Sequence, residues 1–257
     1  MNLPAWLPEL PGEQPHPLAF ATVSGAHLYG FPSADSDVDV RGVHVLPAEQ
    51  VVGLRTGPET LERTWTREGV EVDLVTHDLA KFCRLLLNRN GYVLEQLLSP
   101  LVVTSSPLHG ELVTLAAGCL TRHHAHHYLG FARTQWRLFE RTGELKPLLY
   151  TFRVLLTGLH LMRAGEVEAD LTRLYGYGPA YLPDLVAAKR EAEHGAAPEV
   201  PGAAEDVARL TAELAEAGGT SALPDAATAQ EPLHELVVRT RLRLGDPWQV
   251  TPSLSGR

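Results

Sequence analysis

Two consecutive stretches decide how this chain folds: Ser24-Gly25-Ala26-His27-Leu28-Tyr29-Gly30, and then Asp35-Ser36-Asp37-Val38-Asp39-Val40-Arg41-Gly42. The small residues of the first stretch favour a tight turn, and the alternation of acidic and apolar residues in the second predicts a strand. On that strand Asp37 and Asp39 share one face, with Cα atoms about 6.6 Å apart. Two carboxylates that converge from one face suit a hard cation such as Mg²⁺, which commonly bridges to phosphate oxygens.

The turn at Gly25 and Ala26 supplies the complementary feature, a place for an anion. Small residues let backbone N–H groups approach a phosphate closely, and a helix that starts there adds its dipole. The hydroxyls of Ser24 and Ser36 flank the same segment. An Asp-x-Asp pair alone is more often a solvated strand face, but its combination with this turn is much more specific and predicts binding of a nucleoside triphosphate.

The combined pattern resembles the DNA polymerase beta-type nucleotidyltransferase superfamily, in which a Gly turn opens a helix and Asp-x-Asp follows on the next strand. The longer pattern resembles a bacterial family of predicted nucleotidyltransferases linked to RNA repair, the RNA-ligase-associated group. The residues that match are Gly25, Leu28, Tyr29, Gly30, Ser36, Asp37, Asp39, Arg41, Gly42 and Val43. One position departs from the pattern: Ala26 stands where the family usually has Ser, so one hydroxyl for the phosphate is missing.

The resemblance implies a third carboxylate on a neighbouring strand. The segment 70–76 alternates apolar and acidic residues as a half-buried strand does, and we choose Asp73, with Glu71 as the alternative on the same face. Asp37, Asp39 and Asp73 would then hold Mg²⁺ or Mn²⁺, and Asp73 would position or deprotonate the attacking hydroxyl.

Further residues are expected on the substrate side. Arg41 shares the face of the two aspartates, where it either reaches a phosphate or forms a structural ion pair. Lys146 and Arg153 share one face of a predicted helix, and the resembling family carries Lys and Arg at comparable places. The expected substrate-binding set is Ser24, Gly25, Ala26, Tyr29, Ser36, Arg41, Lys146 and Arg153.

A predicted helix over residues 122–141 offers two more candidate groups. Its arginines at positions 133, 137 and 141 recur at i+4 steps and form a basic stripe, either an RNA-binding surface or a solvated face paired with glutamates. Trp136 and Phe139 between them either stack on bases or pack in the core. His123 and His127 have a zinc-chelating spacing, but no third ligand stands out, which favours a structural or acceptor-facing cluster.

Composition limits the class of protein. The chain has 257 residues and a formal net charge of -9, so nucleic acid would have to bind through a local basic patch. Cys83 and Cys119 lie in apolar helical patterns and read as buried thiols. The N-terminus has no signal-peptide pattern, and no segment is apolar enough to span a membrane. We therefore expect a cytoplasmic protein without a membrane contact.

The expected fold is α+β, with a small mixed sheet, flanking helices and a helical C-terminal half. Strand 18–23, the hairpin of 60–66 with 70–76, and a helix capped by Asp78 form the first part. We expect a nucleotidyltransferase domain over 1–107, a helical domain over 108–244 and a flexible tail over 245–257. Residues 218–230 read as a flexible link because of their Gly, Pro and Ala content.

The sequence thus predicts an Mg²⁺-dependent enzyme that transfers a nucleoside monophosphate from an NTP, with an RNA end as acceptor and an RNA ligase as a partner in repair. Two alternatives stay open. One is an AMP-transferase with a protein acceptor, and the other is a decayed module that senses NTP without turnover. Retention of all three carboxylates argues against decay, and Ala26 argues mildly for it.

Overall fold

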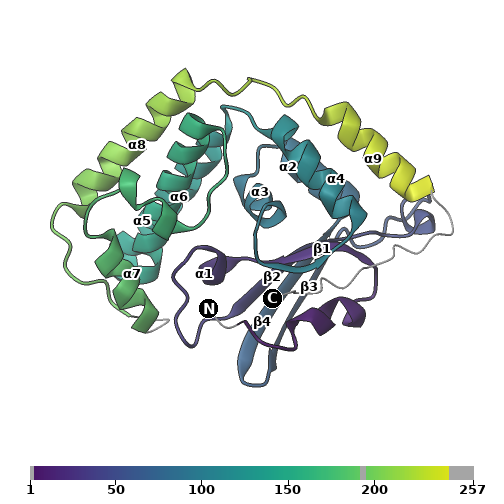
Figure 1. The fold of residues 1–257 in the computed structure, drawn as a ribbon, viewed down its shortest axis with the longest axis horizontal. Helices are drawn as coiled ribbons and strands as arrows, with labels where there is room; N and C mark the ends of the chain where they lie inside the picture. The colour runs from purple at the N-terminus through teal and green to yellow at the C-terminus, as the bar shows by residue number, and fades with distance from the viewer. Residues whose placement is uncertain (1–2, 192–194, 243–257) are drawn as a thin grey trace, which may run out of the picture. The chain divides into compact units, whose positions relative to one another are not determined.

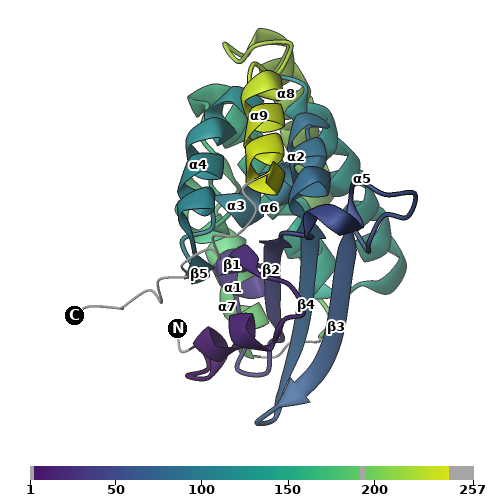
Figure 2. The same ribbon diagram turned by 90° about the vertical axis from the view of Figure 1, so that its right-hand side faces the viewer.

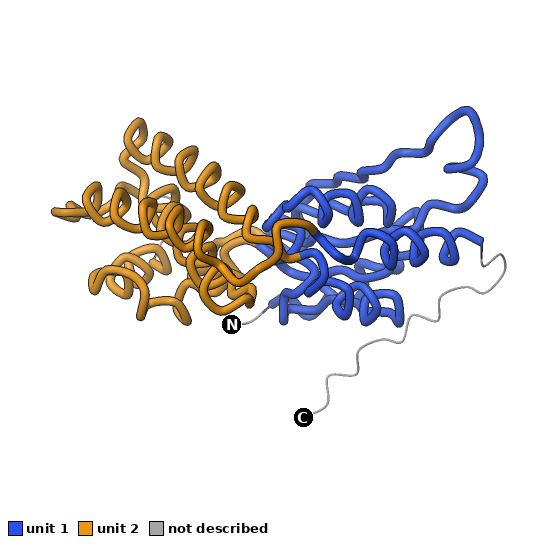
Figure 3. Tube along the Cα trace, turned by 90° about the horizontal axis from the view of Figure 1, so that it is seen from above, with its two compact units in different colours: residues 1–24, 38–119, 227–257 blue, residues 25–37, 120–226 orange. Residues whose placement is uncertain are grey.

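The structure is a computed structural model, and it describes residues 3–191 and 195–242. The chain divides into two compact units, coloured separately in Figure 3. The first unit comprises residues 1–24, 38–119 and 227–257, and the second comprises residues 25–37 and 120–226. The expected boundary near residue 107 stays a prediction, and the expected tail over 245–257 lies outside the described residues.

A mixed sheet forms the centre of the first unit. Its strands are β1 (Leu18–Val23), β2 (Val38–His44), β3 (Thr60–Arg67), β4 (Val70–Asp78) and β5 (Val102–Ser105), in the spatial order β3-β4-β2-β1-β5. Strands β2 and β4 run parallel, whereas the other neighbouring pairs are antiparallel. The α+β class expected from the sequence is confirmed.

The two faces of the sheet are covered differently, as Figures 1 and 2 show. The 3-10 segment η1 (Leu7–Glu13) packs Leu7 and Leu10 against one face, where Val38 and Val40 of β2 are fully buried. Helices α2 (Leu79–Leu87), α3 (Gly91–Leu97) and α4 (Pro107–Ala116) lie over the other face. Because side chains alternate along a strand, Asp39 of β2 belongs to the face that bears α3.

Local sequence signals account for the β3–β4 hairpin and the helix after it. Glu68 and Gly69 both have positive φ, the conformation that a two-residue hairpin turn requires. Asp78 caps α2 as expected, since its carboxylate accepts a hydrogen bond from the Ala80 N–H at 3.0 Å. Strand β5 was not expected, because its four residues are too short to show a clear alternation.

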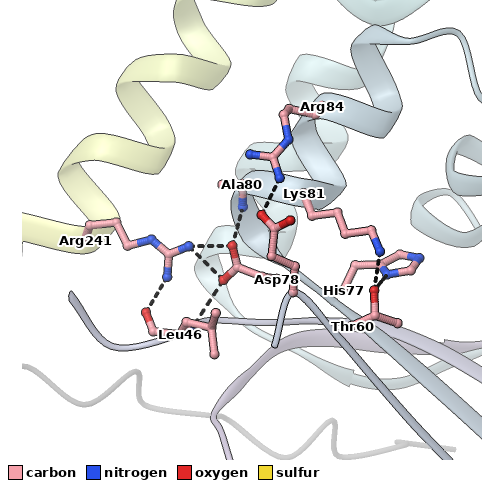
Figure 4. A network of polar contacts seen from close by, with 9 residues as sticks. Leu46, Thr60, His77, Asp78, Ala80, Lys81, Arg84 and Arg241 are labelled. Carbon is pink, nitrogen blue, oxygen red and sulfur yellow. Dashed lines mark hydrogen bonds and ion pairs between the residues drawn. The ribbon is translucent and has the colours of Figure 1, made fainter. Parts of the chain in front are cut away.

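A buried ion pair attaches helix α9 (Gln230–Leu242) to the end of β4 (Figure 4). Arg241 Nη2 lies 2.7 and 2.6 Å from the two carboxylate oxygens of Asp78, and its Nη1 donates to the Leu46 carbonyl. The Leu46 N–H donates to the same carboxylate at 3.1 Å. The C-terminal helix therefore completes the unit that contains the sheet.

The second unit consists mainly of helices: α5 (His124–Thr142), α6 (Leu145–Ala164), α7 (Leu182–Glu191) and α8 (Ala203–Thr220). Helix α8 runs through Gly218 and ends at Thr220, so the prediction that a flexible link starts at residue 218 is wrong. A Cβ at Gly218 would lie 2.9 Å from the Cβ of Ala125, so the glycine allows α8 to approach α5 closely. The short helix α1 (Gly25–Leu28) also belongs to this unit.

Two further expectations about the chain can be compared with the structure. Cys83 and Cys119 are free and buried, as predicted, and burial raises the pKa of their thiols to about 12 and about 11. No helix within residues 3–191 and 195–242 is long and apolar enough to cross a membrane.

Candidate nucleotide and metal site

The parallel pairing of β2 with β4 brings two of the predicted carboxylates together. In this register Asp39 lies directly opposite Asp73, so both side chains leave the sheet on the same face. The two side chains are 28% and 35% exposed, so solvent reaches both. Glu71, the alternative to Asp73, is exposed and lies opposite Thr66 of β3.

Arg41 bridges these two carboxylates. Its Nη2 lies 2.8 Å from Asp39 Oδ1 and 2.8 Å from Asp73 Oδ2. The two oxygens therefore lie no more than twice that distance apart. Only 11% of the arginine side chain is exposed, so the guanidinium is better covered than either of its acidic partners.

Other contacts hold the guanidinium in place. Nη1 donates to the backbone carbonyls of Val40 at 3.0 Å and Asp73 at 2.7 Å, and Nε donates to the Tyr92 hydroxyl at 3.1 Å. Tyr92 is placed by α3, whose cap residue Asn90 accepts a hydrogen bond from the Tyr92 N–H. The pKa of Arg41 lies above its ordinary value: burial opposes its charge, but Tyr92, Asp39 and Asp73 outweigh that effect.

The oxygens of Asp39 and Asp73 fit a hard divalent cation. They already face a positive group, and Mg²⁺ is commonly held by one or two carboxylates together with substrate phosphates. In the described part of the chain, no group of three His, Cys, Asp or Glu side chains is arranged to hold a metal by itself. A metal here would thus take its remaining ligands from water and from nucleotide.

Ser24 and Asp37 flank the strand that carries Asp39. The Ser24 N–H donates to the Asp39 carbonyl at 2.8 Å, and the buried Ser24 hydroxyl has no hydrogen-bond partner among the described residues. Asp37 is exposed and precedes β2, which begins at Val38, one residue later than the alternation predicts. The reason is a turn before it, in which the Ser36 hydroxyl accepts a hydrogen bond from the Ser33 N–H at 3.0 Å.

Residues 25–37, the motif loop, are embedded in the second unit. Ser36 Oγ lies 2.9 Å from Ser33 Oγ, which in turn lies 3.3 Å from Nζ of Lys189 on α7. Lys189 is only 1% exposed, so its ammonium group contacts the motif loop from the interior of the unit.

The first part of the motif loop packs around Tyr29 and Gly30. The guanidinium of Arg153, on α6, stacks 3.9 Å from the centre of the Tyr29 ring, and the two residues are each 2% exposed. Gly30 has a φ of 86°, and a Cβ there would lie 2.1 Å from Oδ1 of Asp170. Only glycine therefore fits at this position.

The remaining expected substrate residues lie in the same helical unit. Gly25, with a φ of 61°, and the buried Ala26 open α1, and Lys146 lies half-buried in the first turn of α6. The roles expected for these residues, and for Tyr29 and Arg153, stay predictions.

Helix α5 presents the expected basic stripe. Its arginines at positions 133, 137 and 141 are exposed, and none makes an ion pair with a described residue. Trp136 and Phe139 are half-buried and contact each other, with ring centroids 5.2 Å apart.

The histidine cluster precedes this stripe. His123 stacks on His126 and lies 3.8 Å from Asp225, and burial, with a further contribution from Arg153, lowers the pKa of His127. Within the described residues no third ligand joins His123 and His127.

Sequence reasoning missed Thr64 and Tyr92, which contact predicted site residues, and Lys189, which contacts Ser33 next to the predicted Ser36. The Thr64 hydroxyl donates to Asp73 Oδ1 at 3.4 Å, a weak contact that the hairpin register creates. Tyr92 lies 51 residues from Arg41, and Lys189 lies 156 residues from Ser33. Nothing in the local pattern around these residues signals such distant contacts.

Comparison with known proteins now adds to the geometry. A model of the RNA repair pathway DNA polymerase beta family matches residues 5–239. An uncharacterized protein of Methanocaldococcus jannaschii is 33% identical over 155 residues, which are 60% of this chain and 63% of that protein. The match therefore spans less than two thirds of that protein's length.

Among solved structures, a nucleotidyltransferase-like protein from Exiguobacterium sibiricum aligns over 92% of this chain and 77% of that chain. The TM-score is 0.32 and the identity is 11%. A likeness this weak carries no argument about fold or chemistry.

Proposed function

The chain belongs to the RNA repair pathway DNA polymerase beta family, and from that premise we propose that it is a divalent-metal-dependent nucleotidyltransferase that modifies an RNA end. One observation carries the proposal. Asp39 and Asp73 lie opposite each other on adjacent parallel strands, with their solvent-accessible carboxylates around one positive group.

The proposed reaction transfers a nucleoside monophosphate. A hydroxyl oxygen of the RNA end attacks the α-phosphorus of an NTP and forms a new P–O bond. The bond from that phosphorus to the oxygen bridging to the β-phosphate breaks, and pyrophosphate leaves. Asp73 accepts the hydroxyl proton. Mg²⁺ or Mn²⁺, when bound, would neutralise charge on the triphosphate.

The residues of this chain would have distinct roles in binding metal and nucleotide. Asp39 and Asp73 would hold the metal–nucleotide complex, and Arg41 lies where it can counter additional negative charge. Asp37 stays the third ligand that the family resemblance implies, although among the described residues it forms no three-residue metal group with the other two. The buried Ser24 hydroxyl has no partner among the described residues and could donate to a phosphate oxygen, which would compensate in part for the hydroxyl missing at Ala26. For Ser36, Lys146 and Arg153, which lie in the second unit, substrate binding stays a proposal that follows from the family resemblance alone.

The acceptor would bind on the α5 stripe. Arg133, Arg137 and Arg141 make no ion pair with a described residue and could neutralise phosphates, and the neighbouring aromatic pair offers a face on which a base could stack. An RNA ligase remains the proposed partner in repair, and the protein is proposed to act in the cytoplasm.

The test is incubation of the protein with each labelled NTP, Mg²⁺ or Mn²⁺, and an RNA, a DNA or a protein acceptor. We expect label on RNA, and we expect Asp39→Asn to abolish it. An Arg173→Gln variant, altered at a 68% exposed arginine outside the motif loop and the carboxylate pair, serves as the control that retains activity. Label on protein alone, or turnover by Asp39→Asn equal to wild type, would contradict the proposal.

A further inference from the structure

A single nitrogen of Arg41, Nη2, bridges the two carboxylates, and the other two guanidinium nitrogens bind other groups. Nη2 makes both charged contacts, to Asp39 Oδ1 and Asp73 Oδ2, whereas Nη1 and Nε bind two backbone carbonyls and the Tyr92 hydroxyl. The side chain therefore has an anchored part and a part that faces the acidic pair.

A metal ion that uses the same two oxygens would compete with Nη2 for them. Mg²⁺ binds carboxylate oxygens at about 2.1 Å, so it would lie within a few ångströms of the guanidinium. Two cations that close repel each other strongly at a partly covered site. Metal binding at these oxygens thus favours movement of Nη2 away from both.

The guanidinium is a rigid plane, so Nη2 leaves the carboxylates only when the whole group shifts and Nη1 gives up its carbonyl contacts as well. A shift that keeps the bond from Nε to the Tyr92 hydroxyl would leave the side chain tethered beside the carboxylates. The exposed fractions of the side chains support replacement of Arg41 by an ion from solvent. The side chains of Asp39 and Asp73 are 28% and 35% exposed, while that of Arg41 is 11% exposed. An incoming ion can reach the carboxylates without first uncovering the arginine.

We infer that Arg41 is a built-in counter-cation that occupies one oxygen each of Asp39 and Asp73 until a divalent ion displaces it, and that Tyr92 is the positioning residue that holds it there. This inference rests on the proposed function, because it presumes that the two carboxylates bind metal. The inference implies that, without metal, Arg41 offsets the repulsion between the two carboxylates, and that a metal ion must compete with Arg41 for them.

The experiment measures Mn²⁺ affinity of the full chain by the loss of the free-ion electron paramagnetic resonance signal, with and without NTP. Removal of the competitor in Arg41→Gln should tighten Mn²⁺ binding by roughly tenfold, the scale on which residues next to a metal site act. Tyr92→Phe, which loses only the hydroxyl, should shift the affinity in the same direction by less. Arg41→Lys keeps a charge and should fall between wild type and Arg41→Gln.

Arg63→Gln is the matched control. Arg63 lies on β3 of the same sheet, opposite Leu74, and its guanidinium stacks 4.2 Å from the centre of the Trp65 ring. Strand alternation directs it away from the face of Asp73, so its loss should leave Mn²⁺ affinity unchanged.

The outcomes separate the inference from the proposed function. If wild type binds Mn²⁺ with NTP but Arg41→Gln and Tyr92→Phe bind it equally or more weakly, Arg41 does not compete and the inference is wrong while the metal site stands. If wild type binds no Mn²⁺ even with NTP, the proposed metal site itself fails. Tyr92→Phe keeps the test decisive should Arg41→Gln fail to fold.

Discussion

At the scale of single residues, the two carboxylate oxygens of Asp73 contact different groups. Its Oδ2 contacts Arg41, and its Oδ1 accepts the long hydrogen bond from Thr64 of the neighbouring strand. Asp73 also lies nearer to β3, on the side of the pair away from β1. This asymmetry is what two distinct roles, metal holding and acceptor activation, would require.

We predict that Asp73→Asn lowers turnover by roughly a hundredfold or more, the contribution of a positioned general base, while NTP affinity changes little. The amide oxygen can still accept from Arg41, so the local structure should persist. Single-turnover kinetics and nucleotide titration measure the two quantities separately. Glu71→Gln, on the same strand face, is the control that should retain activity, and equal losses of affinity and turnover in Asp73→Asn would assign Asp73 to nucleotide binding alone.

At the scale of elements, α9 is attached to the sheet unit through a pair of opposite charges. Asp78 and Arg241 are 2% and 8% exposed, and the same carboxylate caps α2 and binds the Leu46 N–H (Figure 4). Burial would raise the pKa of Asp78, but the hydrogen bonds from Arg241, Leu46 and Ala80 outweigh it and hold the pKa below its ordinary value. The ionised carboxylate is therefore favoured in the folded state.

From this we predict that Asp78→Asn, which keeps the capping oxygen, lowers the free energy of unfolding by about 3 kcal/mol at pH 7 because it leaves Arg241 buried without its partner. A depressed pKa contributes stability above the unfolded value of 3.8, and that contribution is lost as the pH falls through the folded value. Urea unfolding should thus show the wild-type advantage shrinking below about pH 4.

The exposed pair of Arg84 with Glu59 provides the comparison for that measurement. These side chains are 56% and 40% exposed, so Arg84→Gln should change the free energy of unfolding by less than about 1 kcal/mol. A pH-independent difference between Asp78→Asn and wild type would contradict the role assigned to the ionised carboxylate.

At the scale of the whole molecule, charge is distributed unevenly. The chain carries a formal net charge of -9, yet three exposed arginines follow one face of α5 without acidic partners among the described residues. A polyanion would be repelled by the average charge of the protein and could bind only at such a local surface.

We predict that labelled RNA binds with a steep dependence on salt, since each neutralised phosphate releases counterions. The double variant Arg133→Glu and Arg137→Glu should lose this binding but keep NTP binding. Arg173→Glu, at an exposed arginine already paired with Glu168, is the control and should retain RNA binding. A flat salt dependence, or RNA affinity unaffected by the double reversal, would instead favour a protein acceptor.

Local sequence patterns predicted most elements of this fold but few of its contacts. The strand at 18–23, the hairpin, the Asp78 cap and the long helices follow from alternation, capping and helical periodicity, which act between residues close in the chain. Strand β5 and the continuation of α8 through Gly218 did not follow, because each depends on a partner, β1 or α5, that pattern alone does not identify.

What the sequence determined by itself is the chemical content of the site: a glycine turn, Asp39 and Arg41 two residues apart on one strand face, and an acidic strand that carries Asp73. Only the tertiary structure decided that β2 pairs with β4, so that Asp39 lies opposite Asp73. The same holds for the hydrogen bond from Arg41 Nε to the Tyr92 hydroxyl and for the ion pair between Arg241 and Asp78. The physical reason is that sequence patterns report interactions between residues close in the chain, whereas strand pairing joins residues far apart in it. A strand's alternation specifies which face is polar but not which strand lies beside it, and that choice depends on packing of the whole unit.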